Sequence, residues 1–242
     1  MSGLDVVNLV NSELEQYVDG GLEDAMKSFD ANGVTWRQIG LRTPDVRRAA
    51  SRSLTALKRA GFSTIDSVLE AAGQLLSTRV VELRTVAFQW ARSFGDTYET
   101  KHFEIFRIWL EEYVTGWGSC DDLCVGALGI FLYRFPQFVS EVKTWTRSEK
   151  PMTRRAAPVS LIYSLRRGEL GEHCYEIADQ LLNDEHYLVL KGYGWMLKEA
   201  TKHFQNKVFE YVMEHRHNMP RLALRYAIEK MPENLRKEAM KK

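Results

Sequence analysis

Apolar residues recur at helical rather than alternating spacing along nearly the whole chain of 242 residues. Residues typical of turns interrupt this pattern about every 12 to 20 residues, and the alternation typical of strands is nearly absent. The sequence therefore predicts an all-α fold. The expected helices cover residues 43–60, 63–76, 78–93, 98–115, 121–134, 136–147, 152–167, 170–182, 184–202, 204–216, 219–230 and 232–241.

Local signals mark where the first of these helices begin and end. In Thr43-Pro44-Asp45 the threonine suits the cap, the proline suits the first helical position, and the acid complements the helix dipole. Gly61 is expected to end this helix, and Ser63 with Asp66 resembles the start of the next one.

Pro158 falls inside the helix expected over 152–167. A proline in a helix interior clashes with the carbonyl group four residues earlier. We therefore expect either a late helix start near Arg155 or a kink.

Most links between the expected helices are only a few residues long. A succession of helix pairs joined by short links, without a long-range return, is typical of an α-solenoid of antiparallel pairs. No fixed-period identity of the tetratricopeptide or ankyrin type occurs, so a HEAT-like repeat fits best. We expect a single domain over residues 1–242 with a concave basic face. A compact helical bundle is the alternative that periodicity leaves open.

The net charge of +1 conceals three basic runs. Residues 41–60 carry six basic residues and one acid, residues 143–167 carry seven and one, and residues 216–242 carry eight and three. A polyanion responds to the local charge rather than to the total. The runs favour a shared surface for nucleic acid, although each run alone is also explained as the solvated face of one helix.

The cysteines predict neither a disulfide framework nor a metal site. Cys120, Cys124 and Cys174 are too few and too scattered for disulfides in a chain of this length, so we expect free thiols. Cys120 and Cys124 share a helix face but have no histidine at the spacing of zinc ligands. His215 and His217 diverge if they lie on a helix. We expect no metal and no cofactor.

No apolar stretch approaches the roughly 18 residues of a membrane span. The residues from Met1 to Asp5 lack the pattern of a signal peptide. We therefore expect a cytoplasmic protein with no membrane partner.

The segment most informative about chemistry runs from Val114 to Cys124. A tryptophan precedes an acid by four residues, at a helix start expected after a glycine-rich turn, and this arrangement can place the Trp117 indole beside the Asp121 carboxylate. The alternative is that Asp121 lies in the first turn and interacts with the helix dipole, while Trp117 is a packing anchor.

Trp117-x-x-x-Asp121 resembles the tryptophan and catalytic aspartate of the AlkD family of bacterial alkylpurine DNA glycosylases. Four further segments are similar to motifs of that family, in the same order and at similar spacing. The resemblance covers residues 35 to 235 and is weakest for the helices of 1–34. The four segments are Gly40-Leu41-Arg42-Thr43-Pro44-Asp45-x-Arg47, Arg155-Ala156-Ala157, Gly194-Trp195-Met196-Leu197-Lys198-Glu199, and Met219-Pro220-Arg221 through Tyr226-Ala227-Ile228-Glu229.

The sequence also departs from the family pattern. Ser28-Phe29-Asp30-Ala31 stands where the family places an aromatic residue on the phosphate backbone, which indicates that this contact is altered or absent. Gly118 and Pro158 differ from the family as well.

The resemblance implies a monofunctional DNA glycosylase of base-excision repair that removes 3-methyladenine and 7-methylguanine without flipping the base. It implies a cleft of Asp121, Trp117 and Trp195, with Arg155 on the DNA backbone. Arg154 competes with Arg155, because a gap of one residue shifts the alignment between Asp121 and Trp195, and an interhelical salt bridge is the alternative role for Arg155. Further DNA-binding candidates are Arg47, Arg48 and Tyr187.

The residue types suit this chemistry. A purine alkylated at ring nitrogen 3 or 7 is already positively charged, so it departs without a proton, and positive charge builds on the deoxyribose. A carboxylate such as that of Asp121 stabilises this charge and orients a water, and tryptophan faces attract cations. Arginine forms paired hydrogen bonds to phosphate.

The expected partner is double-stranded DNA containing alkylated purines, and we expect a monomer with no obligate protein partner. Two other functions remain open. One is a non-catalytic HEAT-repeat protein that binds bent or branched DNA, against which the presence of both Trp117 and Asp121 argues. The other is a protein-interaction scaffold, against which the charge clusters argue.

Overall fold

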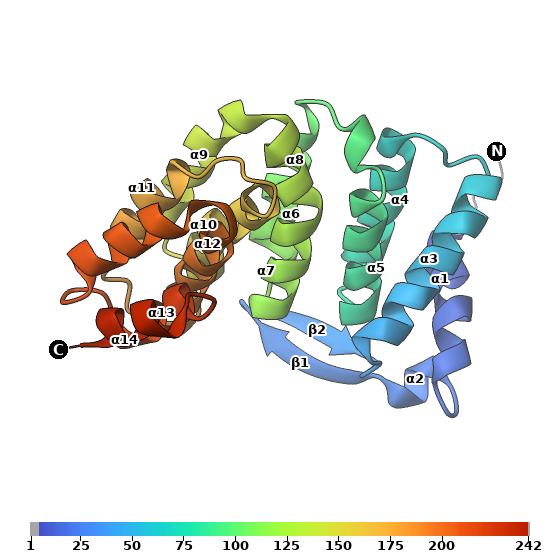
Figure 1. Ribbon diagram of the computed structural model, residues 1–242. Helices are drawn as coiled ribbons and strands as arrows, with labels where there is room; N and C mark the ends of the chain where they lie inside the picture. The colour runs from blue at the N-terminus through green and yellow to red at the C-terminus, as the bar shows by residue number, and fades with distance from the viewer. Residues whose placement is uncertain (1–4, 242) are drawn as a thin grey trace. The chain divides into compact units, whose positions relative to one another are not determined.

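The computed structural model describes residues 5–241, and helices dominate them (Figure 1). The predicted all-α fold is confirmed. Contacts divide the chain after His102 into two compact units, here named unit 1 (up to His102) and unit 2 (from Phe103). The single repeat domain, the stacking of HEAT-like pairs and the concave basic face stay predictions.

Unit 1 is built mainly from four helices. α3 packs against α1 and α5, and α4 packs against α5 (Figure 1). Trp90 of α5 is fully buried, and its indole nitrogen donates a hydrogen bond of 2.9 Å to the carbonyl oxygen of Ala50 in α3. The helical elements are α1 (Val6–Leu14), the 3-10 turn η1 (Glu15–Tyr17), α2 (Leu22–Ala25), α3 (Thr43–Arg59), α4 (Ile65–Ser77), α5 (Val81–Arg92) and the 3-10 turn η2 (Gly95–Thr97).

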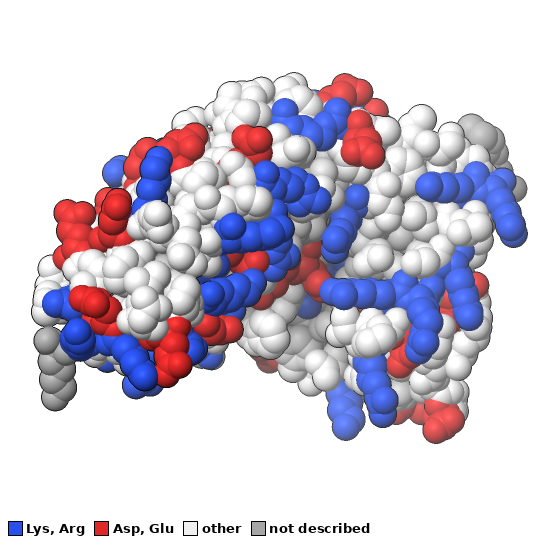
Figure 2. All heavy atoms as spheres, in the orientation of Figure 1, with Lys and Arg blue, Asp and Glu red and all other residues white. Residues whose placement is uncertain are grey.

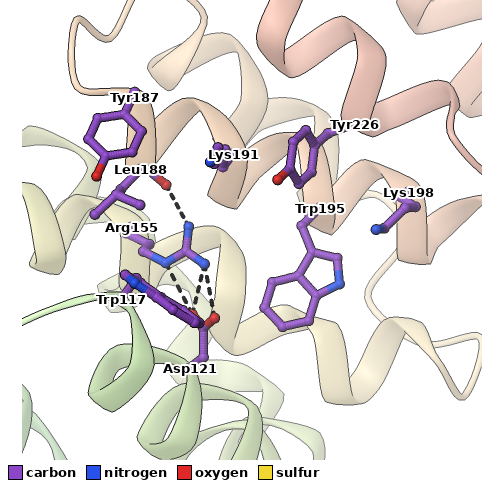
Figure 3. A pocket seen from close by; sticks show the side chains of 9 residues that line it. All are labelled: Trp117, Asp121, Arg155, Tyr187, Leu188, Lys191, Trp195, Lys198 and Tyr226. Carbon is purple, nitrogen blue, oxygen red and sulfur yellow. Dashed lines mark hydrogen bonds and ion pairs between the residues drawn. The ribbon is translucent and has the colours of Figure 1, made fainter.

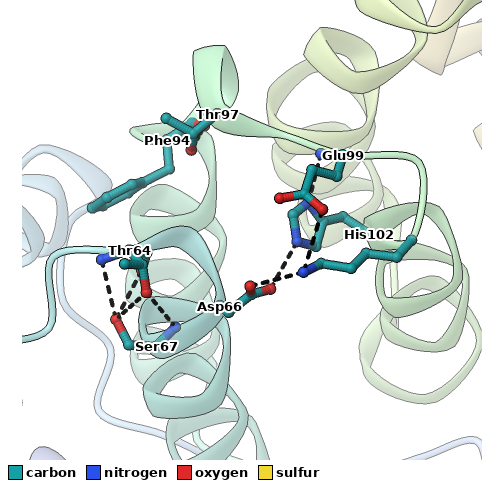
Figure 4. Close-up of polar contacts among 8 residues, drawn as sticks. Thr64, Asp66, Ser67, Phe94, Thr97, Glu99 and His102 are labelled. Carbon is teal, nitrogen blue, oxygen red and sulfur yellow. Dashed lines mark hydrogen bonds and ion pairs between the residues drawn. The ribbon is translucent and has the colours of Figure 1, made fainter.

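The start of α4 differs by one residue from the predicted start. Thr64 rather than Ser63 is the cap, because its hydroxyl accepts a hydrogen bond from the backbone N–H of Ser67, while the Ser67 hydroxyl accepts one from the N–H of Thr64 (Figure 4). This reciprocal pair satisfies two backbone donors at the helix start.

The segment after α5 is tied back to α4 by side chains. The fully buried His102 ring accepts the backbone N–H of Glu99 at Nδ1, so its Nε2 is the atom that donates to Asp66, over 2.9 Å (Figure 4). Lys101 donates to the same carboxylate over 2.8 Å. The hydrogen bonds from Lys101 and His102 lower the pKa of Asp66.

A small β-hairpin in unit 1 is an addition to the helices that the sequence did not predict. β1 (Lys27–Ala31) pairs antiparallel with β2 (Val34–Gln38). Asn32 and Gly33 join them with φ of 55° and 73°, as a two-residue hairpin turn with left-handed backbone requires. Phe29, from the segment in which a phosphate contact is expected to be altered or absent, lies on β1 and is 37% exposed.

The Gly40 segment is held by one buried carboxylate. Glu82 of α5 accepts hydrogen bonds from the backbone N–H groups of Ile39, Gly40 and Leu41 over 3.0, 2.8 and 3.2 Å. Gly40 has a φ of 90°, a left-handed conformation that glycine adopts without strain. This geometry gives a physical reason for the glycine before the Thr43-Pro44 helix start.

Unit 2 surrounds α10, which packs against α8 and α12, while α12 packs against α11 and α13 (Figure 1). Its elements are α6 (His102–Tyr113, whose first residue closes unit 1), α7 (Trp117–Leu123), the π-helical turn η3 (Cys124–Leu128), α8 (Gly129–Arg134), η4 (Pro136–Phe138), α9 (Val139–Thr144), η5 (Trp145–Arg147), α10 (Pro151–Leu165), α11 (His173–Leu181), α12 (Tyr187–His215), α13 (Arg221–Ile228) and α14 (Glu233–Met240).

The structure corrects one helix prediction in unit 2 and confirms another. α10 begins at Pro151 and contains Pro158, so the expected late start near Arg155 is wrong. The break expected between the helices of 184–202 and 204–216 is confirmed. The element α12 consists of two helical segments joined across a kink at Phe204, whose φ of −127° and ψ of 33° are not helical.

α12 and α13 approach each other closely at Gly194. A Cβ atom there would lie 2.7 Å from the Cβ of Tyr226 and 2.8 Å from the carbonyl oxygen of Ala223. Only a residue without a side chain allows this separation.

Across residues 5–241 no single helix is both long and apolar enough to cross a membrane. One bent pair, Trp117–Arg134 with Pro136–Arg147, satisfies length and composition alone.

Candidate active site

A cavity of about 450 Å³ in unit 2 gathers most of the residues singled out from the sequence (Figure 3). Side chains from α7, α10, α12 and α13 surround it. Trp117, Asp121 and Trp195, the predicted cleft residues, all lie here, together with Arg155 and Tyr187. The full lining is Trp117, Asp121, Arg155, Tyr187, Leu188, Lys191, Trp195, Lys198 and Tyr226.

The beginning of α7 sets the first two side chains. The Ser119 hydroxyl accepts hydrogen bonds from the backbone N–H groups of Thr115 and Gly116, and this closes the first turn. α7 begins at Trp117 rather than at the predicted residue 121, so Trp117 and Asp121 lie one turn apart on the same face. Trp117 is 60% exposed, and Asp121 lies beyond the first turn. The alternative of a packing tryptophan and a dipole-bound acid is therefore contradicted.

Arg155 of α10 holds the carboxylate of Asp121 (Figure 3). Its Nε lies 3.1 Å from Oδ1, and one terminal nitrogen lies 2.9 and 3.0 Å from Oδ1 and Oδ2. The other terminal nitrogen donates to the backbone oxygen of Leu188 in α12. Gly192 leaves room for this arginine, because a Cβ there would lie 3.2 Å from the Cγ of Arg155.

The environment of Asp121 acts on its proton affinity in two opposite ways. Burial raises the pKa of this carboxyl, and the charge and hydrogen bonds of Arg155 act to lower it. Burial has the larger effect, so the pKa of Asp121 lies above the ordinary value of an aspartate.

The ion pair with Asp121 is the interhelical salt bridge considered as the alternative role for Arg155. The Arg155 side chain is 5% exposed, and its guanidinium already has protein partners. A phosphate contact by Arg155 stays a prediction, and it requires these hydrogen bonds to rearrange. Arg154 points elsewhere: it pairs with Asp184 over 2.6 Å and donates to the carbonyl oxygen of Ser148. Of the two arginines, Arg155 lines the cavity.

One face of α12 contributes two cations that the sequence analysis missed, Lys191 and Lys198. They follow Tyr187 by four and eleven residues, with Trp195 between them, and this spacing keeps all four on one helix face. The Lys191 ammonium lies 5.4 Å from the ring centre of Tyr187, which is 56% exposed. Lys198 pairs with Glu229 over 3.2 Å. The two lysines could have been predicted from the sequence, because their spacing from Tyr187 places them on the same face of the helix.

The remaining DNA-binding candidates, Arg47 and Arg48, lie on α3 in unit 1. Arg48 pairs with Asp45 and lies 5.6 Å from the ring centre of Tyr17. Figure 2 shows lysine and arginine side chains over α3 in unit 1 and over α10 and α12 in unit 2. Each unit, taken by itself, carries basic side chains on its surface.

The cysteines beside Asp121 are buried and free. The Sγ atoms of Cys120 and Cys124 are 3.9 Å apart, and burial raises the pKa of Cys124 well above that of an ordinary thiol. Cys174 is also buried and free. Within residues 5–241 no group of three histidine, cysteine or acidic side chains is arranged to hold a metal ion.

Three solved structures share the fold. A predicted DNA alkylation repair enzyme from Enterococcus faecalis has a TM-score of 0.70 and 15% identity, with 82% of this chain and 90% of that chain covered. AlkD2 from Streptococcus mutans has a TM-score of 0.60 and 16% identity, with 95% and 100% covered. The smu.31 protein from Streptococcus mutans UA159 has a TM-score of 0.55 and 17% identity, with 77% and 100% covered.

A search of curated proteins found no match. A family model described as "DNA alkylation repair enzyme" matches residues 10–231, which span both units. The resemblance drawn from Trp117, Asp121 and the four further segments is thereby confirmed at the level of the family. The chain belongs to the DNA alkylation repair enzyme family.

Proposed function

We propose that this protein is a monofunctional DNA glycosylase that hydrolyses the N-glycosidic bond of cationic alkylated purines, such as 3-methyladenine and 7-methylguanine, without flipping the base. The observation that carries the proposal is the cavity in which Asp121 lies with Trp117 and Trp195. A carboxylate and two indoles suit a reaction in which positive charge builds on a sugar.

The reaction begins as the bond between the anomeric carbon and the purine nitrogen lengthens, and the electron pair of that bond leaves with the cationic base. The base departs neutral and needs no proton. The ionised Asp121 stabilises the positive deoxyribose and orients a water molecule. The water oxygen forms the new bond to the anomeric carbon, and its proton passes to the carboxylate and then to solvent.

Arg155 has a positioning role in this proposal. Its hydrogen bonds to both oxygens of Asp121 fix the carboxylate and favour its charged form. Lys191 and Lys198 at the same cavity suit the phosphates that flank the lesion. The substrate is then double-stranded DNA, bound by a monomer in the bacterial cytoplasm and associated with the nucleoid.

The decisive experiment is single-turnover release of 7-methylguanine from duplex DNA. Asp121→Asn is expected to lower the rate by ~10²–10³, because it removes one preorganised negative charge. Asp96→Asn is the matched control, since it makes the same change of charge at an exposed position of unit 1, and it is expected to stay close to the wild-type rate.

Equal release by wild type and Asp121→Asn would remove Asp121 from the mechanism. Release by neither protein, with intact folding and DNA affinity, would favour a non-catalytic protein that binds bent or branched DNA.

A further inference from the structure

Glu199 is a nearly buried carboxylate directly behind the cavity, one helical turn after Trp195 on α12. Only 6% of the residue is exposed. Its Oε1 accepts hydrogen bonds from the Trp195 indole nitrogen over 3.1 Å and from Lys230 over 2.9 Å, and its Oε2 accepts one from Arg166 over 2.9 Å. Donors from three parts of unit 2 therefore converge on one side chain.

The carboxylate of Glu199 stays ionised throughout the physiological pH range. Burial acts to raise its pKa, but the hydrogen bonds from Arg166 and Lys230 outweigh burial and lower the pKa to about 2. A full negative charge is thus held against the nitrogen edge of an aromatic ring.

The orientation of Trp195 makes this contact relevant to the cavity. In Figure 3 the six-membered ring of Trp195 points toward Arg155 and Asp121, and the indole nitrogen lies on the opposite edge. Glu199 therefore accepts its hydrogen bond at the edge of the ring that lies away from Asp121. The guanidinium carbon of Arg166 lies 5.9 Å from the ring centre and adds a second contact.

A charged acceptor on an indole N–H does two things. It makes a stronger hydrogen bond than a neutral acceptor, which fixes the ring in one orientation. It also pushes electron density into the ring, and the attraction of a ring face for a cation grows with the negative charge on that face.

We propose that Glu199 is a positioning residue that acts through Trp195, holding the indole by its nitrogen and making its face more attractive to a positively charged sugar. The inference rests on the proposed function, because the cation in question is the deoxyribose formed during base release. The competing explanation is that Glu199 only joins α10, α12 and the segment after α13 by ion pairs.

The test compares two DNA duplexes that differ in one ring. One contains a pyrrolidine nucleotide, whose ring nitrogen is protonated at neutral pH, and the other contains a neutral tetrahydrofuran nucleotide. The ratio of their dissociation constants measures the preference for a cationic sugar and cancels the phosphate contacts that both duplexes share. Wild type is expected to prefer the pyrrolidine duplex.

Glu199→Gln keeps the size of the side chain and an oxygen acceptor but removes the charge. It is expected to lower the preference about threefold to tenfold, within the range of cation–π interactions. Glu210→Gln makes the same change at an exposed position of α12 and is expected to leave the preference unchanged within experimental error.

The same substitution in a Trp195→Phe background separates the two explanations. Removing Glu199 also leaves Arg166 and Lys230 with a missing partner, and that added positive charge acts on the duplex with or without an indole. If Glu199 acts through Trp195, Glu199→Gln has little further effect in Trp195→Phe. An equal loss of preference in both backgrounds, or no preference in wild type, would overturn the inference.

Nuclear magnetic resonance gives a readout that needs no DNA. The chain has six tryptophans, and the Trp195 indole N–H signal is the one lost in Trp195→Phe. Glu199→Gln should move this signal upfield, because an amide is a weaker acceptor than a carboxylate, and an unmoved signal would contradict the proposed contact.

The rate of base release is measured separately from the preference for the pyrrolidine duplex. If the protein releases no base but its preference depends on Glu199, only the proposed function is contradicted. If the protein releases the base but its preference does not depend on Glu199, only this inference is contradicted.

Discussion

The carboxyl group of Asp121 combines two requirements that pull in opposite directions. Exclusion from water strengthens its effect on a nearby cation, and the same exclusion favours the protonated form, which has no charge to offer. The bidentate contact from Arg155 offsets part of this penalty. In the proposed mechanism, the activity therefore depends on the fraction of Asp121 that is ionised.

This balance predicts an acid limit to activity. Because the pKa of Asp121 is raised, the single-turnover rate should fall on acidification with a midpoint above the ordinary pKa of an aspartate. Arg155→Met removes the interactions that lower this pKa, so its midpoint should lie at higher pH than that of wild type. Rates of 7-methylguanine release, corrected for spontaneous loss at each pH, measure both midpoints. A midpoint that is the same in both proteins would show that Arg155 does not tune Asp121.

Single residues also show how much of the candidate site could be predicted from the sequence. The spacing of Trp117 and Asp121 identified two side chains that line one cavity with Trp195. The partner of Asp121 was not predictable in the same way, because Arg155 lies on α10 and meets α7 only in the folded protein. Spacing along one helix is a local property, whereas an ion pair between helices depends on packing.

At the scale of elements, the contact between α12 and α13 positions two residues that line the cavity. Gly194 directly precedes Trp195, and Tyr226 of α13 lies against Gly194 and also lines the cavity. The close approach at Gly194 therefore brings Trp195 and Tyr226, from two different helices, to the same cavity.

Gly194→Ala should destabilise the protein by about 1–3 kcal/mol, because the new Cβ meets the backbone oxygen of Ala223 and cannot be accommodated without moving a helix. Gly73→Ala is the matched control. Gly73 lies within α4 with no atom within 4 Å of an added Cβ, so this change should stabilise by about 0.4–1 kcal/mol. Chemical denaturation of the three proteins measures both effects, and destabilisation by Gly73→Ala as large as that by Gly194→Ala would refute the argument.

The elements also differ in how well the sequence predicted them. The bounds of α3 were predicted to within one residue, because its apolar period extends over several turns. The hairpin of β1 and β2 was missed, since each strand has only five residues. The dipeptide Asn32-Gly33 between residues that favour strands was the available signal.

At the scale of the whole molecule, the candidate contacts to DNA are distributed over both units. Tyr187 and Arg155 lie in unit 2 at the cavity, and Arg47 and Arg48 lie in unit 1. The net charge of +1 is the sum of these basic regions and of acidic ones elsewhere, so the total understates the attraction for a polyanion.

Binding to undamaged duplex DNA should weaken steeply with salt and depend little on sequence. Arg48→Ala should reduce the magnitude of the slope of log affinity against log salt by about 0.9, the value for one phosphate contact. It should leave the rate of base release at saturating protein unchanged. Lys101→Ala, which removes one positive charge from another exposed position of unit 1, is the control. An identical slope in wild type and Arg48→Ala would exclude Arg48 from the DNA contact.

The π-helical turn between α7 and α8 bears on how this chain is aligned with its relatives. Such a turn contains one residue more than an α-helical turn over the same length of helix. Residues 124–128 also contain a kink, because Gly126 has the non-helical φ of −83° and ψ of −113°. Asp121 lies before this irregular turn and Arg155 after it, so one residue more or fewer in the turn would shift which of two consecutive arginines, Arg154 or Arg155, matches the arginine of a relative.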